Sequence, residues 1–336
     1  MTDYIFYPGC SFESSARAYH DSFLAITEQL GIQLHEIEDW NCCGATEYLG
    51  IDLIPAYSLI SRNLALAAEQ ANGTNELVAP CSACFLNLSK ADRYMADRKE
   101  LGAKVNEALQ AGGLHYEPGS IVIRDLLDVI VHEIGIERVK SMVVHPLSGL
   151  RVAPYLGCML TRPDYAQRWS DHEHPTEFID LLTALGAEVV DFPLQTACCG
   201  GHMPQIAPET GFELIHRLIS SAHDLRADLM VTVCPMCQMN IDAYQSETNR
   251  FFGTHLKMPI VFFTQLMALA FGFPADQVGF GAELVSTGAA LKHIGIEVPK
   301  PVEAEPRRRK PEGLPMPTRL LKGGNGRNGK RQEVQR

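Results

Sequence analysis

The chain has 336 residues, of which 46% are hydrophobic and 21% charged, a composition typical of a globular protein with about two domains. The net charge is −11, and residues 301–336 carry ten Lys and Arg against four Asp and Glu, so residues 1–300 carry −17. This acidity argues against nucleic-acid binding, which needs a basic surface to meet phosphates.

Neither the N-terminal residues nor the most apolar stretch of the chain indicates a secreted or membrane protein. The first residues form no basic leader or apolar run, so we expect no secretory signal and a cytoplasmic location. The most apolar stretch, 258–273, is short and contains Thr264 and Gln265. It predicts a buried helix and no transmembrane segment.

Short apolar strands alternate with helical patterns along the chain. The first half predicts strands at 4–7, 33–37 and 76–79, and helices at 13–30, 53–71 and from 81 onward. The second half predicts strands at 151–156, 187–192 and 228–233, and helices at 176–185 and 208–224. Two further apolar stretches, 121–134 and 259–272, predict core helices. The alternation indicates an α/β fold with mainly parallel sheets.

The ten cysteines fall into two sets with one pattern: a single Cys, an adjacent pair, then a C-x-x-C. Without a signal peptide, clustered cysteines more often bind metal or do redox chemistry than form structural disulfides. The first set is Cys10, Cys42, Cys43, Cys81 and Cys84, and the second is Cys158, Cys198, Cys199, Cys234 and Cys237.

The words around the cysteines repeat as well, which predicts a duplicated unit of about 150 residues. Tyr7-Pro8-Gly9-Cys10 matches Tyr155-Leu156-Gly157-Cys158, and each half has a Cys-Cys-Gly. We expect two Rossmann-like domains, 1–148 and 149–302, related by a pseudo-twofold axis. A basic tail, 303–336, is rich in Pro, Gly and charge and predicts disorder.

Each cysteine group follows a predicted strand, so all of them map to the carboxyl ends of parallel strands, where α/β sheets bind ligands. Five thiolates in each half therefore converge on one site. A single zinc or a cubane iron–sulfur cluster takes four ligands, and neighbouring cysteines tend to diverge. Five thiolates favour a larger or more open iron–sulfur assembly, while structural zinc, dithiol exchange and buried thiols remain alternatives.

The complete pattern resembles the cysteine-rich (CCG) domain family, and within it the B subunits of heterodisulfide reductases. Three segments carry the resemblance most strongly: Val152 to Cys158 with Arg162-Pro163, Cys198-Cys199-Gly200-Gly201, and Cys234-Pro235-Met236-Cys237-Gln238-Met239-Asn240. The likeness covers about residues 3–300.

The resemblance implies two noncubane [4Fe-4S] clusters, each held by the five cysteines of one set. It further implies the catalytic part of an oxidoreductase complex that acts on sulfur groups and cleaves or forms a small disulfide. Partners would be a ferredoxin-type iron–sulfur protein, like the C subunits of these reductases, and a flavoprotein like their A subunits. The chain has no C-x-x-C-x-x-C-x-x-x-C run, so relay clusters would lie on the partner. Two clusters facing one cavity suit a two-electron reaction made of one-electron steps.

Two other residues are candidates for catalysis. His202 follows the second Cys-Cys-Gly-Gly and has no counterpart in the first half, so it is a candidate proton donor to a departing thiolate. A loop histidine bonded to a carbonyl is the alternative. Arg162 is a candidate for binding an anionic substrate, against the alternative of a surface salt bridge.

Two other functions fit the same pattern. The chain resembles CCG proteins that transfer electrons in lactate- and glycolate-oxidising complexes. It also fits an adaptor with structural zinc and no turnover. The first would lack disulfide reduction with a viologen donor, and the second would lack visible absorption.

Overall fold

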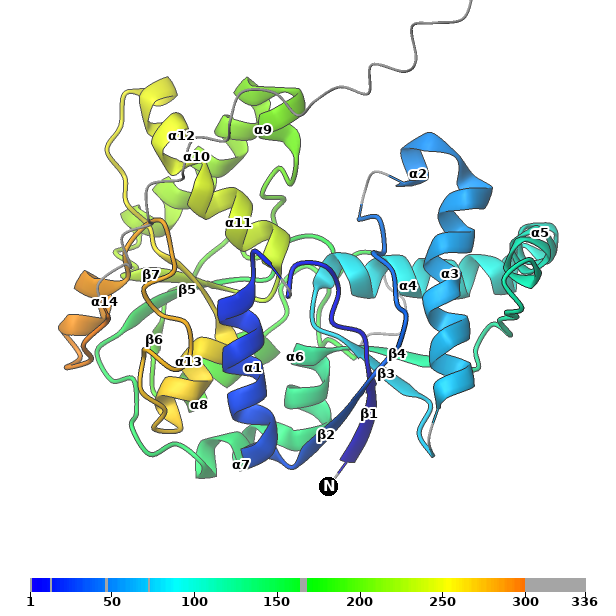
Figure 1. Ribbon diagram of the computed structural model, residues 1–336. Helices are drawn as coiled ribbons and strands as arrows, with labels where there is room; N and C mark the ends of the chain where they lie inside the picture. Colours follow the sequence, from blue (N-terminus) through cyan, green and yellow to red (C-terminus); the bar gives the residue numbers. More distant parts are fainter. Residues whose placement is uncertain (1, 13, 46–47, 72, 164–167, 300–336) are drawn as a thin grey trace, which may run out of the picture. The chain divides into compact units, whose positions relative to one another are not determined.

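The computed structural model describes residues 2–299 except 13, 46–47, 72 and 164–167 (Figure 1). The predicted tail, 303–336, lies outside the described residues. Residues 1–300 form one compact unit that contains two parallel sheets.

The first sheet has four parallel strands in the order β2-β1-β3-β4. The inner strands are apolar because parallel strands are covered on both faces; in β3, for example, the last three of four residues are buried. The strands are β1 (Thr2–Phe6), β2 (Ile32–Glu36), β3 (Glu76–Ala79) and β4 (Val122–Asp125).

Helices of the first half connect these strands. The first long helix is followed by Gly31, whose φ of 73° provides a left-handed cap. The helices are α1 (Arg17–Leu30), α2 (Tyr48–Ile51), α3 (Leu53–Gln70), α4 (Ser82–Asp97), α5 (Lys99–Gln110), α6 (Leu126–Asp128), the π-helical segment η1 (Val129–Gly135) and α7 (Ile136–Ser141).

The second sheet repeats the topology, with parallel strands in the order β6-β5-β7-β8. Its strands are β5 (Arg151–Tyr155), β6 (Glu188–Val189), β7 (Leu229–Thr232) and β8 (Ile260–Phe262). Its helices are α8 (Glu177–Ala184), α9 (Met203–Ile206), α10 (Pro208–Asp224), α11 (Pro235–Ala243), α12 (Gln245–Phe252), α13 (Phe263–Ala270) and α14 (Gly288–Lys292).

The duplicated α/β fold predicted from the sequence is therefore confirmed, with two corrections. The stretches 121–134 and 259–272 are not helices throughout, because each begins as the fourth strand of its sheet, β4 or β8. A fully buried strand and a buried helix have equally continuous apolar sequences, so periodicity does not separate them. Strand β6 is also shorter than the predicted 187–192. The domain boundary between residues 148 and 149 stays a prediction.

The two halves share one hydrophobic core. Helix α1 of the first half packs against α13 of the second, and Figure 1 shows the two side by side. Tyr19 stacks on Phe262 with ring centroids 4.4 Å apart, and it meets Phe263 edge-on at 6.0 Å. The hydroxyls of Ser22 and Thr264 hydrogen bond at 2.7 Å within this contact. The fold thus fixes the two sheets against each other.

Shared packing predicts that one core truncation destabilises both halves together. We expect Phe263→Ala to lower the free energy of unfolding by about 3–5 kcal/mol, because it leaves a cavity at the contact between α1 and α13. Urea denaturation should show a single transition at lower denaturant. The matched control is Phe251→Ala, since Phe251 is 51% exposed and its loss should matter much less. Two separate transitions would contradict the shared core.

Candidate functional site

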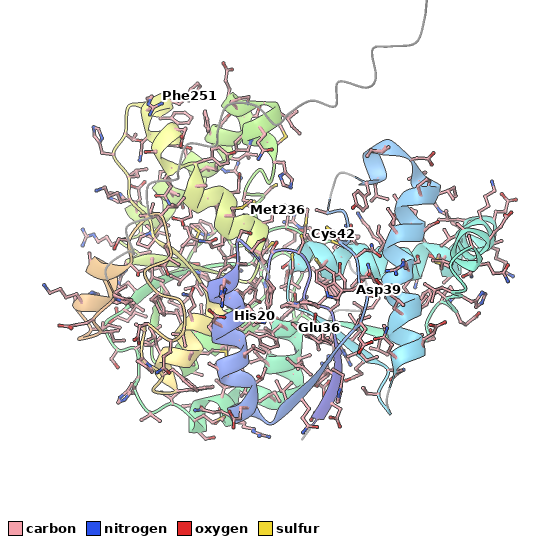
Figure 2. The ribbon with its side chains drawn as sticks, in the orientation of Figure 1. His20, Glu36, Asp39, Cys42, Met236 and Phe251 are labelled. Carbon is pink, nitrogen blue, oxygen red and sulfur yellow. The ribbon has the colours of Figure 1, made fainter. Side chains whose placement is uncertain are left out.

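All six cysteine groups lie just beyond the carboxyl ends of strands. Those of the first half follow β1, β2 and β3, and those of the second follow β5, β6 and β7. Because parallel strands end at one edge of a sheet, each half brings its five thiols to that edge. Figure 2 shows Cys42 in the loop after β2, and Met236 at the start of α11 between two cysteines of the second set.

In the first half, the adjacent cysteines separate toward different partners. The sulfur of Cys42 lies 3.6 Å from that of Cys10, whereas the sulfur of Cys43 lies 3.3 Å from that of Cys84. Cys42 is partly exposed and Cys43 is buried. The two cysteines of the pair therefore contact different thiols of the same set, as expected from the divergence of neighbouring side chains.

The second half repeats this division. Hydrogen bonding with Cys158, followed by the backbone N–H of Gly200 and the charge of Arg162, lowers the pKa of Cys198 to about 6. Hydrogen bonding with Cys199 is the largest cause that raises the pKa of Cys237 well above its usual value. Cys198 is exposed and Cys199 is buried. In both halves, then, the first cysteine of the adjacent pair is the more exposed one and the second is buried.

The C-x-x-C cysteines begin helices. Cys81 is the N-cap residue of α4 and Cys234 that of α11, so Cys84 and Cys237 lie in the first turns. Positive helix N-termini stabilise thiolates and other anions. Hydrogen bonding with Cys234 is also the largest cause that raises the pKa of Cys81. Ser82, the residue after Cys81, lines the cavity walled by the second-half cysteines, so the two thiol sets adjoin near the N-terminus of α4.

A tyrosine in each half supports a cysteine loop, a role that the sequence analysis did not assign. The Tyr7 hydroxyl donates to the carbonyl of Asn41 at 2.7 Å, and Tyr155 does the same to Ala197 at 2.7 Å. Each carbonyl belongs to the residue before an adjacent cysteine pair. The Tyr-x-Gly-Cys motif, present in both halves, was the sequence feature that could have identified these tyrosines.

Asparagine amides hold the second cysteine of each adjacent pair. Asn87 donates to the carbonyl of Cys43 at 3.1 Å, and Asn240 donates to that of Cys199 at 2.7 Å. Each asparagine lies three residues after the last cysteine of its C-x-x-C, one turn along the helix. The repeated C-x-x-C-x-x-N spacing was the signal that could have identified Asn87.

A glycine in each half leaves space beside a thiol. A Cβ on Gly9 would lie 3.0 Å from the sulfur of Cys84, and one on Gly157 would lie 3.0 Å from that of Cys237. Both glycines have positive φ, 72° and 70°, which other residues adopt only with strain. The space around both sulfurs therefore depends on these two positions.

The second thiol set forms the wall of a cavity of about 230 Å³. All five of its cysteines line the cavity, with methionines from three different segments and with His202. One residue of the first half, Ser82, lines it as well. The remaining lining residues are Leu156, Met159, Gly200, Gly201, Met203, Ile206 and Met236. Sulfur and hydrocarbon thus dominate the cavity wall.

The two non-cysteine candidates occupy different positions. His202 lines the cavity and precedes α9. Arg162 is not among the residues that line it. Its guanidinium is 3.3 Å from the Glu173 carboxylate and donates to the carbonyl of Thr196 at 2.5 Å. The structure thus brings His202 to the cysteines, and it ties Arg162 to the loop before Cys198; anion binding by Arg162 stays a prediction.

The donor chemistry fits an iron–sulfur group. Thiolate is the ligand that iron–sulfur clusters use, and each half supplies five cysteines around a buried edge. The glycine positions and the second-half cavity leave room beside the sulfurs. Within the described ranges, no three Cys, His, Asp or Glu side chains are gathered closely enough to hold a metal ion as they stand.

Comparison with known proteins identifies relatives over most of the chain. The cysteine-rich domain family CCG matches residues 4–89 and 152–242. The "8-methylmenaquinol:fumarate reductase membrane anchor subunit" of Wolinella succinogenes is 35% identical, over 84% of this chain and 97% of that protein. The B subunit of the "Ferredoxin/F(420)H(2)-dependent CoB-CoM heterodisulfide reductase" of Methanosarcina acetivorans is 28% identical, over 75% and 83%.

A solved structure confirms the fold. The "hypothetical protein from Helicobacter pylori" has a TM-score of 0.64 at 16% identity, and the match covers 84% of this chain and about half (52%) of that chain. Among the described residues, no helix is both long and apolar enough to cross a membrane.

The asparagine contacts predict a stability effect at the site. We expect Asn240→Ala to lower the free energy of unfolding by about 1–3 kcal/mol, because the buried Cys199 carbonyl loses its side-chain donor. Urea denaturation measures the change. Asn75→Ala is the control, since Asn75 is exposed and its 3.4 Å contact with the Ser120 carbonyl is weak. Equal effects of the two substitutions would contradict the role of Asn240.

Proposed function

Because this chain belongs to the cysteine-rich (CCG) domain family, we propose that it is the catalytic subunit of a cytoplasmic heterodisulfide-reductase-like complex. It cleaves or forms a small disulfide at two noncubane [4Fe-4S] clusters. The observation that carries the proposal is that each half gathers a complete five-cysteine set beyond its strand ends, and that Ser82, next to Cys81, lines the cavity walled by the second set. Relatives named as B subunits of heterodisulfide reductases support it over most of the chain.

Each five-cysteine set would hold one group. In the first half these are Cys10, Cys42, Cys43, Cys81 and Cys84, and in the second Cys158, Cys198, Cys199, Cys234 and Cys237. When bound, an iron–sulfur group would supply single electrons to the sulfur atoms of a substrate. Two adjoining groups match the two electrons that a disulfide takes up on cleavage to two thiolates.

The protein's own residues prepare the second-half cavity for sulfur chemistry. Its methionine and leucine side chains exclude water and accommodate a sulfur-containing substrate, because thioethers are polarisable and flexible. His202, at the cavity wall, would give a proton to the departing thiolate, which leaves more readily as a neutral thiol. Cleavage of R–S–S–R′ then consumes two electrons and two protons and releases RSH and R′SH.

The proposal includes partner proteins. Relatives are named as subunits of larger reductases, which supports a role within a complex. We propose a ferredoxin-type partner, like the C subunits of these reductases, that exchanges electrons with this chain, and behind it a flavoprotein like their A subunits. The direction of the reaction follows from the potential of the sulfur couple relative to the electron donor, at about 30 mV per decade for two electrons.

A second candidate is favoured by one relative. The fumarate reductase anchor protein from Wolinella succinogenes is 35% identical over nearly its whole length. Its name gives 8-methylmenaquinol, a quinol, as a substrate of that reductase. On this alternative the chain passes electrons between a quinol and a reductase without acting on disulfides. Disulfide turnover by the purified chain with reduced viologen separates the two, since only the first candidate predicts it.

Iron and acid-labile sulfide analysis tests the proposal directly. Anaerobically purified protein should contain about eight iron and eight sulfide per chain, and reduced viologen should drive disulfide cleavage. Cys199→Ala should reduce the iron content by about half and abolish turnover. Cys43→Ala is the matched variant of the first half and should do the same. Full iron content and full disulfide reduction in both variants would overturn the proposal, and zinc without iron would indicate a structural adaptor.

The cavity position of His202 predicts a catalytic effect. His202→Gln should keep the iron content of the wild type and lower kcat for disulfide cleavage about 100-fold or more, the usual contribution of a general acid. Steady-state kinetics across pH measures the loss. His255→Gln, an exposed histidine that does not line the cavity, should leave kcat unchanged. An unaltered kcat and pH profile in His202→Gln would remove this residue from the mechanism.

A further inference from the structure

Ser82 links the two thiol sets. It is the second residue of the first-half C-x-x-C and the first residue of α4, yet it lines the cavity of the second half. Its side chain is fully buried, at 0% exposure. Ser82 follows Cys81, and Cys234 of the second half also lines this cavity. The serine therefore lies where one half touches the cysteines of the other.

The Ser82 hydroxyl has no hydrogen-bond partner among the residues that the structure describes. Leaving a buried hydroxyl unpaired is unfavourable, and each such group in a native protein calls for an explanation, such as a redox role or a bound partner. The second-half C-x-x-C has Pro235 at the equivalent position, which offers no hydroxyl. The feature is thus specific to the first half, and it lies at the cavity of the second.

The other residues around the cavity limit what this hydroxyl can meet. Apart from cysteines, Ser82 and His202 provide the polar side chains among the described lining residues. The rest are glycine, methionine, leucine and isoleucine, which offer no strong acceptor. Besides the His202 ring and backbone carbonyls, sulfur is the acceptor that this lining offers, and an anionic sulfur is a strong one.

We propose that Ser82 donates a hydrogen bond across the boundary between the halves to an anionic sulfur of the iron–sulfur group held by the second-half cysteines. This inference rests on the proposed function, because it needs that group to be present. Ser82 is a positioning residue that stabilises the reduced form, which carries one more negative charge. It thereby raises the reduction potential of the second-half group relative to that of the first.

A redox titration followed by electron paramagnetic resonance tests the inference on the substrate-free holoprotein. Ser82→Ala should shift one of the two midpoint potentials to a more negative value and leave the other in place. Ser82→Thr keeps the hydroxyl and should return the shifted potential toward that of the wild type. Iron content should be the same in all three proteins.

The control is Ser61→Ala. Ser61 is also fully buried, but its hydroxyl already donates to the Met95 sulfur at 3.1 Å, and it does not line the cavity. Its loss should affect stability and neither potential. Unchanged potentials in Ser82→Ala at full iron content would overturn this inference alone, whereas iron-free wild-type protein would overturn the proposed function.

Discussion

The contact between the thiols of Cys81 and Cys234 constrains the arrangement of both halves. These residues are the N-caps of the helices that follow β3 and β7, and Ser82, next to Cys81, lines the cavity of the second-half cysteines, so the carboxyl ends of β3 and β7 lie near each other. The packing of α1 on α13 maintains this arrangement beside the cysteines, through Tyr19, Phe262 and Phe263. The Tyr19 hydroxyl also donates to the carbonyl of Pro80, the residue before Cys81. Sulfur chemistry and core packing therefore depend on the same relative placement of the sheets.

Burial affects whether these cysteines are thiols or thiolates. Six of the ten cysteines are buried, and burial disfavours a thiolate unless a positive partner compensates. Helix N-termini and backbone N–H groups provide part of that compensation, and a bound cationic metal would provide the rest. On the proposed function a bound metal group would stabilise these clustered thiolates. The asparagine, tyrosine and glycine positions around them are duplicated along with the cysteines.

The sequence predicted the duplicated α/β fold and the location of the cysteines because both rest on local patterns. The strand and helix periodicity predicted the elements. Because each cysteine group follows a predicted strand, the cysteines were expected at the carboxyl edge of each sheet. The start of β8 was missed because Ile260 to Phe262 continues directly into an equally apolar helix. The Cys81–Cys234 contact and the position of Ser82 were missed because they depend on packing between halves about 150 residues apart, which no spacing within one half records.

Duplication alone would make two equal sites, but the side chains around the two thiol sets differ. Backbone support is matched, because an N–H donates to the sulfur of Cys42 and to that of Cys198 at 3.3 Å. Arg162, His202 and Ser82, in contrast, all lie near the second set. A guanidinium, an imidazole and a hydroxyl all favour added negative charge, so electrons that enter either half would collect at the second, beside the cavity. On the proposed function, a two-electron reaction beside the cavity would need the first half to hold the other electron, which would account for five cysteines in both halves.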